Sequence, residues 1–439
     1  MVKHICDQCG KEFSNKSHYT SHIQEATDCG KETEEEPIYK FSKLSRDITN
    51  KIDKQVKKVY GIYFTPPITV YKSLEILDEY MGNISSVLEP SCGSGEYIRG
   101  IRSMYPHLTI TGIEIEKTIF ESISIYESEN VTLFNENFLT YNPDMKYDLV
   151  IGNPPYYVLK LNDVDRMYRK YFDGRPNLFI LFIIKSLHLL NSDGIMSLVL
   201  PQNFLNCLYY DKTRKYIFEN YSILHISECH DKYIETQQNT ILFIVQNKKP
   251  IDNMIFTINL SGYTIFGTPD NIITLNALYK DSTTLSELGF NVNVGSVVWN
   301  QNKDDLTDDD TKPMLVYSPD ISNNELSITS FSNPEKKNYI NKKGHTAPLL
   351  VLNRGYGMGE YKFNYCIINE YQRGEYLVEN HLMCIKHLHP ISNENLIQKY
   401  REIICSFNNT KTNEFIKIYF GNNAINTTEL CKILPIYDI

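Results

Sequence analysis

The chain has 439 residues, a mass of 51.0 kDa and 42% hydrophobic residues, which is enough for a sizeable core in two or three domains. Its formal net charge is −9, so a nucleic acid would have to bind through local basic patches rather than through the overall field. The longest apolar run, Leu178–Leu190, is too short to span a bilayer and contains Lys185. We therefore expect a buried helix there and no membrane span.

The start of the chain is polar. Of its ten cysteines, only Cys6, Cys9 and Cys29 form a cluster, and the other seven are scattered along the rest of the chain. These features predict an intracellular protein, in the cytoplasm or nucleus, without a secretory signal or a disulfide framework.

Residues 1–30 predict a small separate unit that holds a metal ion. The candidate ligands follow the spacing Cys6-x2-Cys9-x12-His22-x6-Cys29, and two thiolates with an imidazole can close a tetrahedral zinc site. The stretch resembles a C2H2-type zinc finger that ends in cysteine, although its last gap is longer than usual and His18 is a competing ligand. A unit this small scarcely folds alone, so we expect Zn²⁺ to stabilise it.

Residues 31–59 predict a linker followed by an amphipathic helix. The acidic run Lys31–Pro37 is typical of a solvated linker. From Tyr39 to Tyr60 an apolar residue recurs at every fourth position, which indicates one helix. The same stretch is rich in lysine, so its polar face is either simply solvated or a contact for a nucleic-acid backbone.

Strands alternate with helices from about Ser85 to Asn247. The candidate strands are 85–90, 108–116, 131–136, 147–153, 194–201, 222–230 and 240–247. Helical segments between the early strands indicate a mostly parallel, doubly wound α/β sheet, with the last two strands as an antiparallel pair. We expect one α/β domain over residues 60–248 and a second domain over 249–439, where short strand-like runs alternate with polar loops.

A glycine-rich turn follows the first of these strands. The strand ends in Glu89 and Pro90, and the turn Gly93-x-Gly95 leads into a helix. Glycines there allow positive φ angles and a close approach of a ligand to the backbone. Glu114 ends the next strand, where an acid can accept hydrogen bonds from both ribose hydroxyls of a nucleoside. The turn lacks the third glycine of dinucleotide-binding loops, which favours S-adenosylmethionine (SAM) over NAD.

Two further stretches of the sequence contain a pair of adjacent prolines. Thr65 precedes two prolines, and its hydroxyl could hold a carboxylate such as the amino-acid end of SAM, although an ordinary rigid loop is the alternative. The second stretch, Asn153–Tyr156, reads Asn-Pro-Pro-Tyr and directly follows the apolar run of the fourth strand.

Taken together, these motifs resemble the gamma-group N6-adenine DNA methyltransferases, the TaqI-like family. The matching segments occur in that family's order: FTPP, VLEPSCGSG, GIEIE, ENFLTY, DLVIGNPPYYV, PNLFILFIIKSLHLL and DGIMSLVLPQNFL. The resemblance covers roughly residues 60–247, and the C-terminal part matches in placement and general character. It implies a Rossmann-like SAM-dependent methyltransferase fold, a C-terminal target-recognition domain, double-stranded DNA as substrate, and a monomer. A cognate restriction endonuclease is the partner it suggests, and a large DNA virus is one source it allows.

The resemblance also implies roles for individual residues. Glu114 would bind the ribose of SAM, Asn137 would accept from the amino group of the cofactor adenine, and Phe138 would pack on that adenine. The family commonly has Asp where this chain has Asn137. Tyr233 lies where the family has an aromatic residue that stacks on the flipped target base, with a surface tyrosine as the alternative reading. The methionine part of SAM would be lined by Thr65, Glu89, Pro90, Gly93 and Gly95.

The Asn-Pro-Pro-Tyr motif suggests how the transfer would occur. The N6 amine of adenine is a poor nucleophile because its lone pair is conjugated into the ring. The Asn153 side chain and the Pro154 backbone can accept both amino hydrogens and aim the lone pair at the methyl group. Pro154 and Pro155 restrict the loop and donate nothing. Tyr156 offers a flat face for the target base, which must leave the duplex.

The C-terminal domain is expected to supply sequence specificity. Arg354 lies in a glycine-rich stretch and is a candidate base or phosphate contact. Lys336 and Lys337 belong to a basic run that contacts phosphates or is simply a solvated loop. We expect the acidic loop 304–310 to face away from DNA.

Three alternatives stay open at this stage. Release-factor glutamine methyltransferases also carry Asn-Pro-Pro-Tyr after a SAM fold, although they usually lack a large C-terminal domain. RNA methylation is the second alternative. The third is a DNA-binding protein with an inactive methyltransferase core, which the intact motifs argue against.

Overall fold

The computed structural model describes residues 4–5, 12–13, 40–231, 233–234, 238–354, 362–369, 374–420 and 424–437. The predicted zinc ligands Cys6, Cys9, His22 and Cys29 lie outside these residues. Two short strands, β1 (His4–Ile5) and β2 (Glu12–Phe13), pair antiparallel. Among the described residues, the cysteines are all free and no cluster of acidic, histidine or cysteine side chains could hold a metal. In that same part of the chain no helix is long and apolar enough to cross a bilayer.

The chain divides into two compact units that do not follow a single cut. Unit 1 comprises residues 1–158, 177–200 and 229–242, and unit 2 comprises 159–176, 201–228 and 243–439. The expected boundary at residue 248 stays a prediction. Hydrogen bonds join residues on its two sides within unit 2: the buried Arg214 guanidinium donates to the carbonyl of Thr264, and Asn253 accepts from the Ile223 backbone at 2.7 Å.

A seven-stranded sheet forms the core of the α/β part, and all seven predicted strands are confirmed. The strand order is β5-β4-β3-β6-β7-β9-β8, and the pairs β4–β5, β3–β4, β3–β6 and β6–β7 are parallel. The strands are β3 (Ser86–Glu89), β4 (Thr109–Ile113), β5 (Val131–Phe134), β6 (Tyr147–Gly152), β7 (Leu190–Pro201), β8 (Ser222–Cys229) and β9 (Thr240–Gln246).

This strand order determines where a ligand can bind. Within this sheet, the first strand along the chain is the inner strand β3. The next two, β4 and β5, lie on one side of it, and the chain then crosses to β6 on the other side. The loops after β3 and β6 therefore leave the carboxyl end of the sheet in opposite directions, and such a switch point is where open α/β sheets bind their ligands. The glycine-rich turn and the Asn-Pro-Pro-Tyr motif occupy these two loops.

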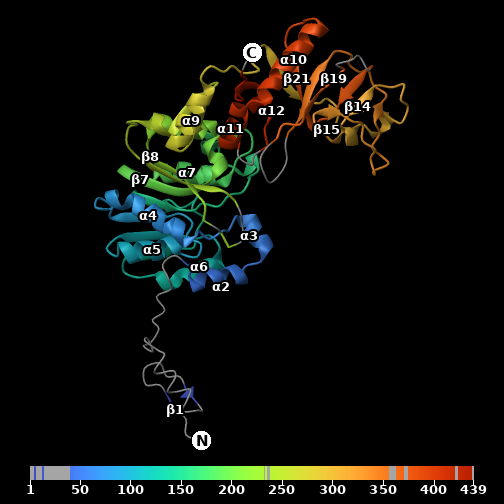
Figure 1. Ribbon diagram of the computed structural model, residues 1–439. Coiled ribbons are helices and arrows are strands. Elements are labelled where there is room, and N and C mark those ends of the chain that lie inside the picture. Colours follow the sequence, from blue (N-terminus) through green and yellow to red (C-terminus); the bar gives the residue numbers. More distant parts are fainter. Residues whose placement is uncertain are drawn as a thin grey trace. The chain divides into compact units, whose positions relative to one another are not determined.

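Four helices of unit 1 follow the predicted alternation, as labelled in Figure 1. Gly100 lets two of them approach closely, because a Cβ there would lie 2.9 Å from the Val70 side chain. The predicted buried helix over the longest apolar run is confirmed, since nearly all of its residues are buried. The helices are α4 (Pro67–Met81), α5 (Glu96–Met104), α6 (Lys117–Ile123) and α7 (Leu178–His188).

The basic segment before the sheet forms two helices where the periodicity predicts one. These are α2 (Lys43–Lys51), which lies beside α6 (Figure 1), and α3 (Lys54–Tyr60). Ile52 is extended, and the Asp53 side chain caps α3 by accepting from the Gln55 backbone at 2.7 Å. A capping aspartate in mid-pattern ends one helix and starts the next, which the apolar spacing alone could not reveal.

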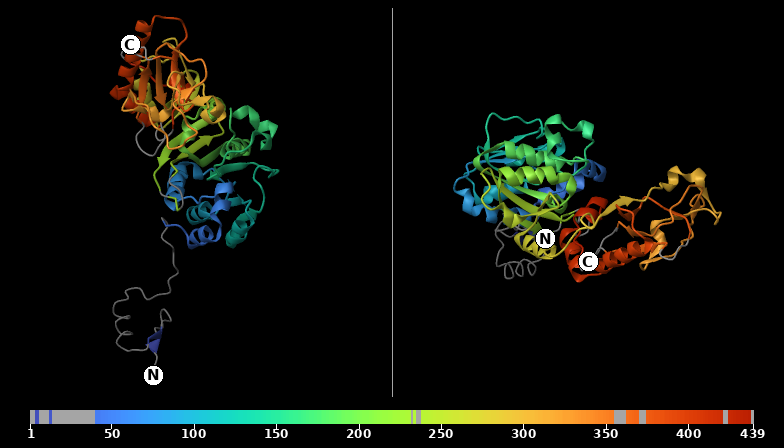
Figure 2. Two further views of the ribbon diagram at one scale, coloured as in Figure 1. Left: turned by 90° about the vertical axis from the view of Figure 1, so that its right-hand side faces the viewer. Right: turned by 90° about the horizontal axis from the view of Figure 1, so that it is seen from above.

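Unit 2 contains a four-stranded antiparallel sheet with the order β12-β21-β18-β19. Helices from the end of the chain (red) run along this sheet (orange) in Figure 2, and they share one hydrophobic core with it. The strands are β12 (Phe290–Val294), β18 (Leu349–Asn353), β19 (Tyr365–Ile368) and β21 (Leu382–His387). The helices at the end of the chain are α10 (Asn393–Phe407), α11 (Thr410–Tyr419) and α12 (Thr427–Lys432), and α9 (Pro269–Tyr279), which precedes the sheet in the chain, adds to the same core.

A second small sheet in unit 2 has the order β13-β17-β14-β20. Its strands are β13 (Leu306–Thr307), β14 (Met314–Val316), β17 (Tyr339–Ile340) and β20 (Tyr376–Val378). Unit 2 also contains two hairpins and a further helix: β10 (Thr257–Leu260) with β11 (Tyr263–Phe266), β15 (Ile321–Ser322) with β16 (Glu325–Leu326), and α8 (Asp211–Asn220).

Candidate active site

The Asn-Pro-Pro-Tyr motif begins immediately after β6, at the carboxyl end of the sheet. The Asn153 amide nitrogen donates to the Tyr63 carbonyl at 3.2 Å, and the Tyr156 hydroxyl lies 2.5 Å from the Asn153 amide oxygen. The same hydroxyl lies 2.7 Å from the Val199 carbonyl, at the end of β7. Pro154 is buried, so the loop is held on several sides.

Two tyrosine side chains converge on this asparagine. The Tyr156 ring meets Phe179 edge-on, with ring centroids 6.0 Å apart, and burial raises the pKa of its hydroxyl well above the usual value. Tyr233 is only 9% exposed. Burial also raises the pKa of Tyr233, while hydrogen bonding to Thr240 and to the Asn153 side chain opposes the rise. The structure thus brings Tyr233, which the sequence singled out only by position, next to Asn153.

The glycine-rich turn has the backbone conformation that its sequence predicts. Gly93 has φ of +53° and Gly95 has φ of +76°, in the left-handed region that favours glycine. A Cβ at Gly95 would lie 2.7 Å from the Tyr126 ring. The Gly93 backbone donates to the Glu114 carboxylate at 2.9 Å, so the predicted ribose-binding acid lies directly against the turn.

Buried acids surround this turn. Glu114 is 7% exposed, and burial raises its pKa to about 7 even though backbone donors from Glu116 and Gly93 oppose the shift. Glu89 is 2% exposed, and burial, followed by the charges of Glu114 and Glu96, raises its pKa well above the usual value. The Oε2 atom of Glu89 has no hydrogen-bond partner within the described part of the chain.

These acids fit SAM as a cofactor. An orphaned, buried carboxylate oxygen costs free energy unless a donor reaches it, and the ammonium group of SAM is such a donor. SAM also brings a sulfonium charge to a region that is rich in acidic groups. Glu89 and the turn would therefore hold the methionine part, and Glu114 would hold the ribose.

The remaining predicted cofactor residues occupy three different settings. Thr65 is buried beside the start of α4. Asn137 is exposed, and its amide oxygen accepts from the Leu139 backbone at 2.9 Å. Phe138 is 2% exposed and packs 4.8 Å from Phe182, so its ring contributes to the core of unit 1. The contacts of these residues with the cofactor adenine stay predictions.

The glycine-rich turn 91–95, called the cofactor turn below, contacts the loop 153–156, called the catalytic loop below. The Ser91 hydroxyl donates to the Asn153 carbonyl at 3.1 Å. A Cβ at Gly152 would lie 3.4 Å from the Pro90 side chain, an ordinary van der Waals distance, so the two loops lie next to each other here. A methyl donor bound at the turn would therefore lie next to the Asn153 side chain.

The predicted DNA contacts of the C-terminal part have internal partners. The Lys336 ammonium lies over three aromatic rings, at 4.6 Å from Tyr317, 4.6 Å from Phe331 and 5.3 Å from Trp299. The Lys337 ammonium pairs with Asp308 at 2.5 Å. The acidic loop and the basic run therefore lie side by side, and the expectation that this loop faces away from DNA stays a prediction.

Arg354 follows β18 and is half-buried. Its Nε atom is buried and has no hydrogen-bond partner in the part of the chain that the structure describes. The rest of its glycine-rich stretch, residues 355–361, lies outside the described residues. A contact between Arg354 and DNA stays a prediction.

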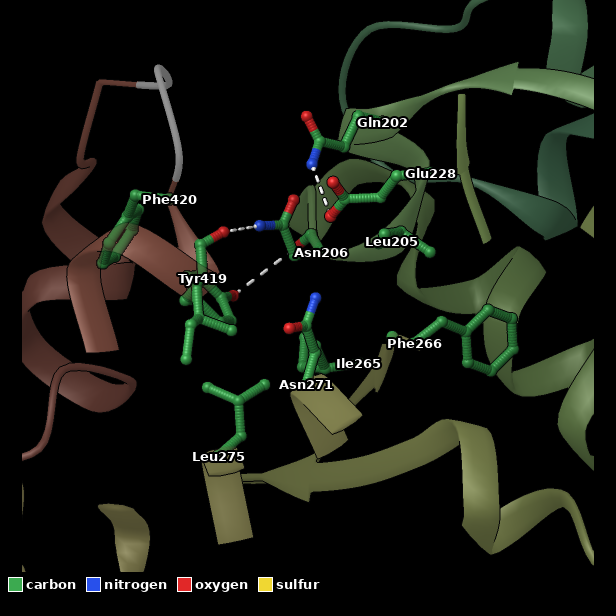
Figure 3. Close-up of a pocket in the computed structure, with 12 residues that line it drawn as sticks. Gln202, Leu205, Asn206, Glu228, Ile265, Phe266, Asn271, Leu275, Tyr419 and Phe420 are labelled. Atoms are coloured by element: carbon green, nitrogen blue, oxygen red, sulfur yellow. Dashed lines mark hydrogen bonds between the residues drawn. The ribbon is translucent and has the colours of Figure 1, made fainter. Parts of the chain in front are cut away.

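A pocket in unit 2, shown in Figure 3, is too small to be the substrate site. It offers about 30 Å³, room for a water molecule or two but not for a nucleobase. Its polar side chains also pair with one another: Gln202 donates to Glu228 at 3.2 Å, and Asn206 donates to the Tyr419 carbonyl.

Sequence reasoning missed the segment Gly61–Phe64. It provides the carbonyl that accepts from Asn153, and Gly61 packs against the catalytic loop. A signal was available, because an isolated glycine directly before the FTPP motif indicates a backbone turn. The partner of that turn, however, lies about ninety residues away, and no local pattern identifies it.

Part of the candidate site lies within a segment that matches a known protein family. The sequence model of the family "Eco57I restriction-modification methylase" matches residues 107–234, which include Glu114, Asn153 and Tyr233.

Three relatives illustrate the similarity. The type II methyltransferase M.CvrRI of Paramecium bursaria Chlorella virus XZ-6E is 24% identical over 90% of this chain and 99% of its own length. The modification methylase CviBIII of Paramecium bursaria Chlorella virus NC1A is 27% identical over 91% of this chain and all of its own length. The type II methyltransferase M.AccI of Acinetobacter calcoaceticus is 30% identical over 42% of this chain and 35% of its own length.

Proposed function

We propose that this chain is a type II DNA methyltransferase that transfers the methyl group of SAM to the N6 amine of a flipped-out adenine at a specific site. The carrying observation is the position of Asn153 and Pro154, at the carboxyl end of β6 and hydrogen-bonded to the cofactor turn through Ser91. The viral relatives, which are named as type II or modification methylases, match the chain over about nine-tenths of its length and support the same activity.

The chemistry depends on two fixed acceptors. The Asn153 amide oxygen and the Pro154 carbonyl accept the two hydrogens of the adenine amine and stabilise the positive charge that develops on nitrogen. SAM supplies an electrophilic methyl group on a sulfonium. The turn orients that group, and the transfer is direct, without a covalent enzyme intermediate or an initial general base.

The free enzyme already has a donor where the amine would bind. The Tyr156 hydroxyl lies within hydrogen-bonding distance of both the Asn153 amide oxygen and the Val199 carbonyl, but it has only one proton. When the adenine amine arrives, the hydroxyl can donate to Val199 alone. The amide oxygen is then released to the substrate, and no polar group is left without a partner.

The target base must be extrahelical to reach this site, because its N6 atom is otherwise paired within the duplex. Tyr156 and Tyr233, whose hydroxyls both contact the Asn153 side chain, are the aromatic residues predicted to stack on the base. Base–aromatic stacking contributes about 1–3 kcal/mol per base, enough to offset much of the cost of flipping.

Further parts of the proposal concern the ends of the chain. Zn²⁺ bound by Cys6, Cys9, His22 and Cys29 would stabilise an N-terminal finger, and metal analysis of the purified protein tests this directly. The C-terminal part would select the DNA sequence, with Arg354, Lys336 and Lys337 as candidate contacts. We further propose a monomer that acts on its own, with or without a cognate endonuclease.

Transfer of radiolabelled methyl from SAM tests the function. The protein is incubated with unmethylated duplex DNA, with RNA and with a release-factor protein, and the label is counted in each. We expect N6-methyladenine in DNA at one short sequence, mapped by sequencing. Label in RNA or protein but not in DNA would refute the proposal, and absence of any transfer would favour a binding protein with an inactive core.

A further inference from the structure

The segment Gly61–Phe64 lies between the two loops of the candidate active site. Its Tyr63 carbonyl accepts from the Asn153 amide nitrogen at 3.2 Å. A Cβ at Gly61 would lie 3.0 Å from the Tyr156 backbone nitrogen. At its other end, the Phe64 ring lies 3.2 Å from the position of a Cβ at Gly93 in the cofactor turn. One short segment therefore contacts both the catalytic loop and the cofactor turn.

This segment is itself anchored to the cofactor turn through α2 and α3. The Ile62 backbone donates to the Lys57 carbonyl at 2.9 Å, and the buried Lys57 ammonium donates to the Thr49 carbonyl. On α2, the Ser45 hydroxyl donates to Ser94 of the turn at 2.7 Å. The segment thus has little freedom to move away from the catalytic loop while the turn keeps its conformation.

Two of the hydrogen-bond partners of the Asn153 side chain, Tyr63 and Tyr156, specify the orientation of its amide. A carbonyl oxygen, on Tyr63, can only accept, so the NH₂ group of Asn153 must face it. The amide oxygen must then face the opposite way, where the Tyr156 hydroxyl donates to it. That is the oxygen which the proposed reaction requires for the adenine amine.

We propose that the Tyr63 carbonyl is a positioning group for the methyl transfer, and that it selects an amide rather than a carboxylate at position 153. The inference rests on the proposed function and adds the reason for the residue type. A carboxylate accepts hydrogen bonds more strongly than an amide. In this site, however, its second oxygen would face the Tyr63 carbonyl, and two acceptors would repel each other.

The decisive variant is Asn153→Asp, assayed across pH at saturating SAM. If Tyr63 positions the group, the ionised aspartate is turned away from its carbonyl, and we expect kcat near pH 8 to fall by about a hundredfold or more. A protonated aspartate can donate to Tyr63 as the amide does. Both desolvation and the facing Tyr63 carbonyl favour the protonated form of this carboxyl, so its activity relative to wild type at the same pH should rise about tenfold between about pH 8 and about pH 5.

A change in backbone position supplies the second variant. Gly61→Ala would press its Cβ against the Tyr156 backbone and displace the segment from the catalytic loop. We expect kcat to fall about tenfold or more, with SAM affinity within about twofold of wild type. Gly262→Ala is the matched control, because Gly262 has φ of +87° and no atom within 4 Å of the added Cβ. It imposes the same backbone strain without the contact and should keep the wild-type kcat.

These outcomes separate the inference from the proposed function. Transfer to DNA by the wild type tests the function, whereas the inference concerns only the ratio of variant to wild type on whichever substrate is methylated. SAM binding by calorimetry shows that each variant is folded. An Asn153→Asp enzyme that is fully active at pH 8, or one that binds SAM but recovers no activity at low pH, would overturn the positioning role. A Gly61→Ala enzyme with unchanged kcat would also overturn it.

Discussion

The pH dependence of SAM binding follows from the buried acids around the cofactor turn. Burial raises the pKa of Glu114 to about 7, and its two carboxylate oxygens can each accept strongly from a ribose hydroxyl of SAM only when the group is ionised. SAM binding must therefore weaken as the pH falls through this value. With a pKa of about 7, roughly one site in eleven is ionised at pH 6 and ten in eleven at pH 8. The expected loss of affinity between these pH values is about tenfold, or about 1.4 kcal/mol.

The pKa of Glu89, which burial also raises, acts in the same direction, because the ammonium group of SAM favours its ionised form. The same shift acts on stability with the opposite sign. A carboxyl whose folded-state pKa is raised stabilises the fold below its unfolded value, near 4.5, and this contribution is lost as the pH rises through about 7. The free protein should thus lose stability over that range, and bound SAM should restore part of it.

Calorimetric titration of SAM from about pH 6 to about pH 8 measures this dependence, and repetition in buffers of different ionisation enthalpy counts the protons released. Glu114→Gln is the informative variant, because an amide cannot ionise. Its affinity should be lower at pH 8 and should vary less with pH. Affinity that is constant or increases toward low pH in the wild type would refute the assignment of Glu114 to the ribose.

Three further predictions concern single side chains. Asn153→Ala should abolish methyl transfer and leave SAM affinity within about twofold, and a large loss of SAM affinity in calorimetry would contradict its role. Tyr156→Phe keeps the ring and should retain more activity than Tyr156→Ala, which loses stacking worth about 1–3 kcal/mol; equal kcat/KM for the two variants would exclude stacking. Gly95→Ala meets the Tyr126 ring at 2.7 Å and should lower both Tm and SAM affinity, whereas Gly82→Ala meets no atom within 4 Å and should change neither.

Much of the fold followed from local patterns. Short apolar runs, the earlier ones separated by helical segments, identify all seven strands of the α/β sheet. The strands of its parallel part are recognisable because a strand buried between helices must be apolar on both faces. Gly93 and Gly95 could also be assigned to a turn with positive φ from sequence alone. The break between α2 and α3 could not, because one capping residue, Asp53, overrides an otherwise regular apolar spacing.

The C-terminal lysines show a second kind of limit. A run of lysines beside a loop of aspartates reads equally well as a nucleic-acid contact or as a set of internal ion pairs. The structure joins Lys337 to Asp308 and encloses Lys336 among three aromatic rings. These contacts depend on how loops from different strands meet, and the charges in the sequence carry no information about that.

The local sequence alone specified the chemistry of this protein: an amide followed by two rigid prolines at a strand end, and an acid after the next strand. Each of these groups is placed by the residues directly next to it in the chain, so a local pattern is enough to identify it. Only the tertiary structure decided which way the Asn153 amide points, because the Tyr63 carbonyl that its nitrogen faces belongs to a segment about ninety residues earlier in the chain, whereas Tyr156 lies in the same loop. Hydrogen-bond direction depends on such partners in space, and the folded chain alone brings them together.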